Sequence, residues 1–135
     1  MTPNAISSTI NAYLANNWTE VATVPIRRIN RDPEPKVPYI EMYFRPGQVR
    51  AIEIQGASQR PGVFKINVFT EPGNGTGQGE VYAGIIEDLF TNQYIDGVWC
   101  ASGDLMPYTE DLGIDEALQA YHHQVTVPFT VISEG

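Results

Sequence analysis

The amino-acid sequence predicts an α+β domain: a mainly antiparallel sheet of about five strands with two principal helices packed on it. Three observations support this fold class. Apolar residues recur at helical spacing near the start of the chain and again across residues 80–90. Apolar and polar residues alternate in several other stretches, as they do in strands with one buried face. Segments rich in glycine and proline separate these periodic stretches.

Size and composition limit the function. The 135 residues have the length of a single domain spanning residues 1–135. No apolar run approaches the roughly 20 residues that cross a bilayer, and the first residues lack the features of a secretory signal, so we expect no membrane partner. The lone cysteine, Cys100, suits a reducing compartment. The net charge of −8 disfavours a nucleic-acid-binding function, because phosphate contacts need clustered Lys and Arg.

The first half of the chain predicts one helix followed by strands. Thr2 and Pro3 are typical of a helix start, and the spacing of Ile6, Ile10 and Leu14 predicts a helix over residues 3–16. Residues 20–29, 38–45, 49–54 and 62–70 are predicted strands, of which the last three form an antiparallel meander. A proline within residues 20–29 places that strand at a sheet edge or bend.

The second half predicts one more helix and a long closing strand. Residues 71–79 are rich in glycine and are expected to form a mobile loop, which leads into an amphipathic helix over residues 80–90. Residues 98–101 are a predicted short strand. Residues 102–118 are expected to be an insertion, a loop with a brief helical turn near its end. Residues 121–132 alternate as a strand, and Pro128 predicts that part of it lies at a sheet edge.

No motif predicts catalysis, a cofactor or a metal. The glycine-rich loop ends at Glu80 and lacks the Lys of a phosphate loop, so a connector is the better interpretation. His122 and His123 are neighbours on a strand and point to opposite faces, which favours packing over metal ligation. No basic neighbour activates Cys100. The acidic residues of segment 104–116 lack the regular pattern of a calcium loop, and a solvated acidic loop is favoured over a weak magnesium site.

The residues expected to carry function are therefore candidates for protein contacts. Tyr39, Glu41 and Tyr43 should share the strand face opposite the core, where Glu41 could pair with Arg45 or Arg50 of a neighbouring subunit. The glycine-rich loop is expected to become ordered against a partner subunit or tube. It supplies the remaining candidate interface residues: Gly73, Asn74, Gly75, Thr76 and Gly77.

The order of elements resembles the tail terminator, or tail completion, proteins of long-tailed bacteriophages. The resemblance covers nearly the whole chain and rests on pattern and length. The matching segments are the opening helix through Leu14 and Trp18, residues 38–44, residues 60–68, the glycine loop with the helix over 80–90, and the closing strand. Segment 102–118 does not match well.

The resemblance implies a structural virion protein that forms a ring, usually of six subunits, on the end of the tail tube. Such a ring stops tube polymerisation and provides a head-joining surface. Its implied partners are other copies of the chain, the tail tube protein and the head connector protein, with DNA passing through the lumen without specific binding. The implied location is the virion tail, and the host cytoplasm during assembly. Two alternatives stay open: a cytoplasmic small-molecule-binding domain or enzyme with a cleft under the glycine loop, and another phage connector or tube protein.

Overall fold

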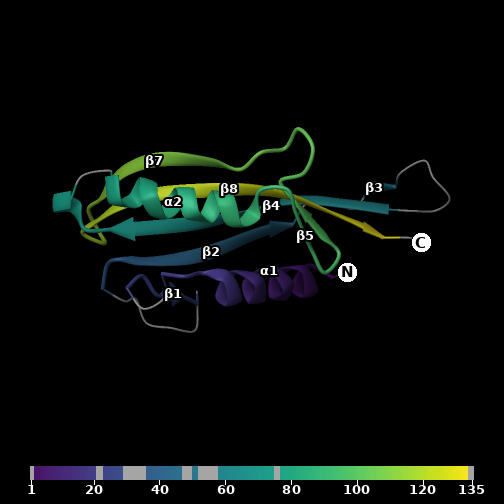
Figure 1. Cartoon of the computed structure of the whole chain (residues 1–135), viewed down its shortest axis with the longest axis horizontal. Coiled ribbons are helices and arrows are strands. Elements are labelled where there is room, and N and C mark those ends of the chain that lie inside the picture. Colours follow the sequence, from purple (N-terminus) through teal and green to yellow (C-terminus); the bar gives the residue numbers. More distant parts are fainter. Residues whose placement is uncertain are drawn as a thin grey trace.

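The computed structural model describes residues 2–20, 23–28, 36–46, 50–51, 58–74 and 77–133. Within them the chain forms two α-helices, one 3-10 helix and eight strands (Figure 1). In chain order these are α1 (Pro3–Asn17), β1 (Ile26–Arg27), β2 (Tyr39–Pro46), β3 (Arg50–Ala51), β4 (Ser58–Thr70), η1 (Pro72–Asn74), α2 (Gly77–Phe90), β5 (Gln93–Ile95), β6 (Val98–Cys100), β7 (Tyr108–Asp115) and β8 (Ala120–Ser133).

The described strands belong to one sheet of order β1-β2-β4-β8-β6-β5, with β3 on β4 and β7 on β8. All pairings are antiparallel except that of β1 with β2, which is parallel. The predicted α+β class and mainly antiparallel sheet are confirmed. The predicted count of about five strands was too low, because eight are present in the described residues.

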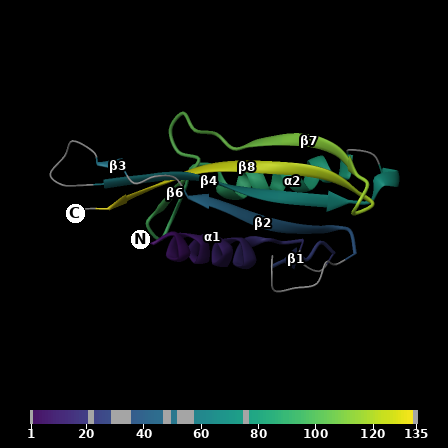
Figure 2. The same cartoon turned by 180° about the vertical axis from the view of Figure 1, so that it is seen from behind.

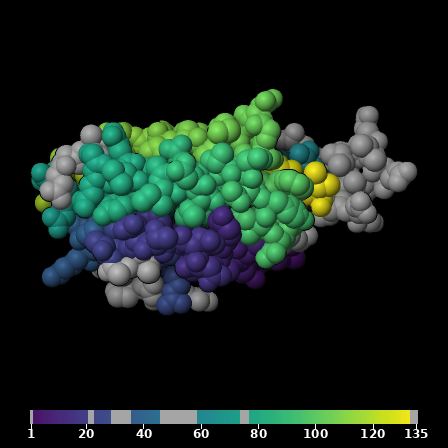
Figure 3. Space-filling model, viewed as in Figure 1, coloured from purple at the N-terminus to yellow at the C-terminus, as the bar shows by residue number. Residues whose placement is uncertain are grey.

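Both helices pack on the same face of the sheet. Figure 3 shows α2 and α1 side by side across this face, and Figure 2 shows the opposite face, where β7, β8, β4 and β2 lie next to one another. The Tyr13 hydroxyl of α1 donates a 2.8 Å hydrogen bond to the Leu89 carbonyl of α2 and so links the two helices. We call the sheet face without helices the open face.

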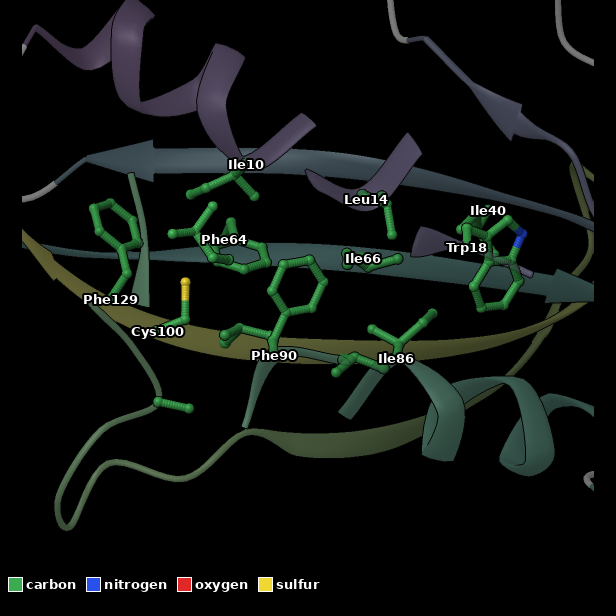
Figure 4. Close-up of a cluster of buried hydrophobic side chains, with 14 of the residues drawn as sticks. Ile10, Leu14, Trp18, Ile40, Phe64, Ile66, Ile86, Phe90, Cys100 and Phe129 are labelled. Carbon is green, nitrogen blue, oxygen red and sulfur yellow. The ribbon is translucent and has the colours of Figure 1, made fainter. Parts of the chain in front are cut away.

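The main core lies between the helices and the sheet (Figure 4). Ile6, Ile10 and Leu14 of α1 are fully buried, as their helical spacing predicts. Phe64 of β4 contacts Phe90 of α2 edge to face, with ring centroids 4.9 Å apart. Burial of a large apolar side chain of this kind stabilises the fold by about 1.5–3 kcal/mol.

The start of α1 agrees with its sequence signals. The Thr2 hydroxyl accepts a 3.1 Å hydrogen bond from the Ala5 backbone N–H, and Pro3 occupies the first turn. A capping side chain of this kind satisfies one of the free N–H groups at a helix start and contributes roughly 1 kcal/mol. The helix ends at Asn17, one residue beyond the predicted end.

The closing strand β8 lies inside the sheet, so the predicted edge position was wrong. It pairs with β4 along one side and with β7 and then β6 along the other. Pro128 falls between the last residue paired to β7, Thr126, and the first paired to β6, Phe129. The Pro128 carbonyl accepts a 2.8 Å bond from Ala101 on that side. The missing N–H therefore coincides with the change of partner strand.

Two other predictions need correction in the first half of the chain. Strand β4 begins at Ser58, before the predicted start at residue 62, and β3 pairs with β4 instead of continuing a meander from β2. A strand was predicted over residues 20–29, but its described part contains only the two-residue strand β1. Strand β1 begins directly after Pro25 and lies at the sheet edge, as the proline predicts.

The second half differs from the predictions at two segments. Helix α2 begins at Gly77, three residues before the predicted start at Glu80. Segment 102–118, predicted to be a loop with a helical turn, contains the eight-residue strand β7. The hairpin strand β5 was also missed.

Candidate assembly surface

The described residues contain no group of three or more His, Cys, Asp or Glu side chains placed to hold a metal. The thiol of Cys100 is fully buried, and burial raises its pKa to about 12. A thiol with so high a pKa is a poor nucleophile near neutral pH.

No helix in the described part of the chain is both long enough and apolar enough to span a bilayer.

The two histidines lie on opposite faces of β8, as predicted. His123 is buried on the helix side, with only 1% of its surface exposed. His122 lies on the open face, half-buried, and its ring stacks on Phe69 with centroids 4.5 Å apart. Burial lowers the pKa of His122, an effect that Asp115 and Glu41 oppose and His123 adds to.

A row of polar side chains crosses the open face from β1 to β7. The strand register aligns Arg27, Glu41, Asn67, Gln124 and Glu110 across five strands. Arg27 forms a 2.7 Å ion pair with Glu41, and the Asn67 amide donates to the same carboxylate at 3.4 Å. The Asn67 carbonyl oxygen accepts from Gln124 at 2.9 Å and lies 2.9 Å from Nε2 of His122. The part of the row from Arg27 to Gln124 is therefore held together within the subunit.

This row changes the predicted role of Glu41. The sequence suggested that Glu41 pairs with Arg45 or Arg50 of a neighbouring subunit, whereas its carboxylate pairs with Arg27 of its own chain. Arg27 was not among the candidate interface residues, so its role was missed. The parallel register of β1 with β2, which places Arg27 opposite Glu41, leaves no signal in the local sequence.

The next row of the open face ends in two exposed tyrosines. The register aligns Tyr43 of β2, Lys65 of β4, Thr126 of β8 and Tyr108 of β7. Tyr43 is 41% exposed and Tyr108 is 52% exposed. The guanidinium of Arg45 lies over the Tyr43 ring, 5.2 Å from its centroid. Tyr43 thus fits the prediction of an exposed aromatic on this strand face.

Tyr39 does not share this exposure, and the sequence-based prediction was wrong on this point. Only 1% of its surface is exposed. Its ring contacts Phe69 with centroids 5.0 Å apart, and the two form a second, smaller core with Ala120. Alternation correctly placed Tyr39 opposite the main core, but the residues that cover it come from distant strands.

The other predicted interface residues are dispersed. Arg50 begins β3, where its backbone pairs with Gln59. Gly73 and Asn74 belong to η1, and Gly77 starts α2. Gly75 and Thr76 lie outside the described residues. The role of this segment in partner contacts, and its predicted mobility, stay predictions.

Several exposed apolar residues were missed by the sequence analysis. Tyr94 and Trp99 contact each other edge to face across the β5–β6 hairpin, with centroids 4.4 Å apart, and are 55% and 44% exposed. On β7, Leu112 and Ile114 are 48% and 59% exposed. Exposed apolar groups of this kind are common where proteins meet other proteins. For Tyr94 and Trp99 a signal was present in the sequence, as aromatic residues in two short segments.

A shallow pocket of about 420 Å³ lies at one end of the sheet. Lys36, Tyr39, Glu71 and the turn from β7 to β8 contribute to its lining. Glu71 places the pocket at the start of the glycine-rich segment. Among the described residues, the lining combines one lysine, one glutamate and mostly apolar or amide side chains, with no nucleophile next to a base.

These features define an α+β fold whose exposed aromatic and charged side chains on strands suit contacts with other proteins. The chain belongs to the phage tail terminator protein family, whose sequence model matches residues 5–131. It is thus a structural protein of the phage tail, as the resemblance predicted.

Solved structures agree on the fold. One, from a protein with no stated function, aligns with a TM-score of 0.68 at 19% identity and covers 97% of this chain and 96% of its own. Another belongs to the virion of a native gene transfer agent particle, with a TM-score of 0.58 at 16% identity, covering 95% and 93% of the two chains. At these identities the likeness shows the fold alone. No curated protein matches the sequence.

Proposed function

We propose that this protein forms a closed ring, of six copies, on the end of the phage tail tube. There it stops tube polymerisation and provides the surface to which the head connector joins. The observation that carries this proposal is the family match across residues 5–131. Assembly takes place in the host cytoplasm, and the finished ring stays in the virion tail.

The two faces of the sheet support an assembly role. Both helices cover one face, which leaves charged and aromatic side chains of β2 and β7 on the other. Strands at the border of a sheet are natural sites of association unless they are protected. Tyr43, Arg45 and Arg50, together with segment 73–77, are the residues we propose for contacts with a neighbouring subunit or with the tube.

The charge of the chain suits a channel for DNA. With a net charge of −8, a ring of these subunits repels the phosphate backbone and lets DNA slide without specific binding. We propose that the protein works without catalysis, because function here rests on association. The ring contacts the tail tube protein on one side and the head connector protein on the other.

Native mass spectrometry combined with negative-stain imaging of the purified full chain tests ring formation. The expected result is one dominant species at six times the subunit mass, seen as a ring with a central opening. Cys100→Ser serves as a control for covalent association, because the ring should persist without the thiol. A protein that stays monomeric at concentrations well above those of assembly contradicts the ring.

A further inference from the structure

Charge is distributed very unevenly along the chain. All eight lysines and arginines lie between Arg27 and Lys65, and none follows. Of the 16 acidic residues, five precede Lys65 and eleven follow it. A chain with two halves of opposite charge favours contacts between unlike halves, either within one molecule or between copies.

The fold carries this asymmetry onto opposite borders of one sheet. The basic segment forms β1, β2 and β4, whereas β7 belongs to the acidic segment and lies beyond β8. Figure 2 shows β2 and β7 on opposite sides of the open face, with β4 and β8 between them. Strands β2 and β7 are therefore separated by two strands, β4 and β8.

Each border combines an exposed tyrosine with charges. The basic rim consists of Tyr43 and Arg45 of β2, together with Lys65, which lies next to Tyr43 on the inner strand β4. The acidic rim consists of Tyr108 and Glu110, which stand on the open face of β7, together with the exposed Asp104 of the segment that leads from β6 into β7. Tyr43 and Tyr108 end the same row of residues across the sheet, so the two rims lie at a similar level along the strands.

Within the described residues, neither rim is closed by a further strand. Among the described strands, β7 pairs with β8 alone, and β1 pairs with β2 only at Ile40 and Glu41. A sheet whose two borders carry opposite charges is suited to a head-to-tail contact. In such a contact the basic border of one subunit meets the acidic border of the next, and the contact repeats around a ring. Electrostatic complementarity of this kind fixes register and suppresses wrong partners.

We propose that the partner of the acidic rim is the basic rim of a second copy of this chain. In this contact Arg45 and Lys65 of one subunit face Asp104 and Glu110 of the next, and Tyr43 and Tyr108 supply the apolar part. The inference rests on the proposed ring and specifies which surfaces close it.

Reversal of charge on one rim at a time tests the contact. One variant carries Arg45→Glu and Lys65→Glu, and the other carries Asp104→Lys and Glu110→Lys. Each variant alone brings like charges together at every contact, and we expect the affinity of each contact to fall at least about tenfold, with loss of the ring. Circular dichroism and thermal unfolding confirm that each variant is folded.

Mixing the two variants provides the decisive readout. In an alternating ring every contact again joins unlike charges, because the reversed basic rim meets the reversed acidic rim and the two unaltered rims meet each other. An equimolar mixture is therefore expected to restore rings that contain equal numbers of the two variants. The control pair Asp88→Lys and Asp96→Lys makes the same change in net charge on exposed positions of α2 and the β5–β6 turn. By itself, this control variant should still form rings. When it is mixed with the variant whose basic rim is reversed, it should not bring that variant into rings.

The outcomes separate this inference from the proposed function. Rings formed by either reversed variant alone, or rescue by the control pair, overturn the assignment of the rims while the wild-type ring stands. Failure of the equimolar mixture to form rings also overturns it. A wild-type chain that forms no ring overturns the proposed function and this inference together.

Discussion

The imidazole of His123 fills the space next to Gly79: a Cβ placed on Gly79 would lie 2.2 Å from Nδ1 and 2.5 Å from Cε1 of that ring. Gly79 lies in the first turn of α2, and His123 is buried in the middle of β8. This close approach brings the start of α2 down onto the sheet. Packing against His123 therefore requires a glycine at position 79. The sequence did not indicate this, because Gly79 is one of several glycines in the segment predicted to be a loop.

We predict that Gly79→Ala lowers the free energy of unfolding by roughly 1–3 kcal/mol, because the added methyl group overpacks the contact. Gly84 provides the matched control in the same helix, since a Cβ there meets nothing within 4 Å. Gly84→Ala should raise stability by about 0.5–1 kcal/mol. Urea unfolding of both variants measures the difference, and equal effects would contradict the packing role.

Tyr39 and Tyr43 should respond in opposite ways to truncation. Tyr39→Ala removes a buried ring and should cost about 3–5 kcal/mol of unfolding free energy. Tyr43→Ala removes a ring that is 41% exposed and should leave the monomer's circular dichroism and unfolding transition almost unchanged while it shifts the ring toward monomers. Native mass spectrometry and thermal unfolding read out the two effects. A large loss of monomer stability in Tyr43→Ala would place this side chain in the core.

His122 should make stability depend on pH in weakly acidic solution. Burial lowers its pKa in the folded state below the usual 6.5, so the unfolded chain binds a proton first as the pH falls. The stability contributed by neutral His122 is present above about pH 6.5 and is lost as the pH falls toward the folded-state pKa. His122→Gln retains a donor for Asn67 and should flatten this part of the profile. Thermal unfolding between about pH 5 and 8 measures it, and identical profiles for the two proteins would contradict the assignment.

Cys100 should be unreactive in the folded protein. Its pKa of about 12 keeps the thiol protonated, and burial blocks access. We expect maleimide labelling near pH 8 to be far slower in the native state than in urea. Because the folded pKa lies above the ordinary value of 9.0, the stability tied to this thiol is present below pH 9 and declines as the pH rises toward 12. Rapid labelling of the native protein would show that the site opens.

The helices and central strands were predictable because one face of each carries apolar residues at the proper period. Ile6, Ile10 and Leu14 predicted α1, and the alternation from Val125 to Val131 predicted the buried face of β8. Strand β7 was missed because it lies at a border, with acidic residues and exposed side chains such as Tyr108 and Ile114. A strand with little burial leaves no periodic signal.

The candidate surface was predictable only in part, because contacts between distant strands determine it. Tyr43 was placed correctly from alternation on β2. The burial of Tyr39 depends on Phe69 and Ala120, and the ion pair of Glu41 depends on the register of β1. Pairings of this kind are set by tertiary structure and have no local signature.

The central claim is that this protein caps the tail tube, and a tube-polymerisation assay tests it most directly. Purified tail tube protein is allowed to polymerise with increasing amounts of the full chain, and tube lengths and ends are measured by electron microscopy. We predict shorter tubes with a ring at one end and no further growth after capping. The variant with Arg45→Glu and Lys65→Glu should fail to cap unless the variant with Asp104→Lys and Glu110→Lys is added. Tubes that keep their normal length and bare ends at saturating wild-type protein would contradict the account.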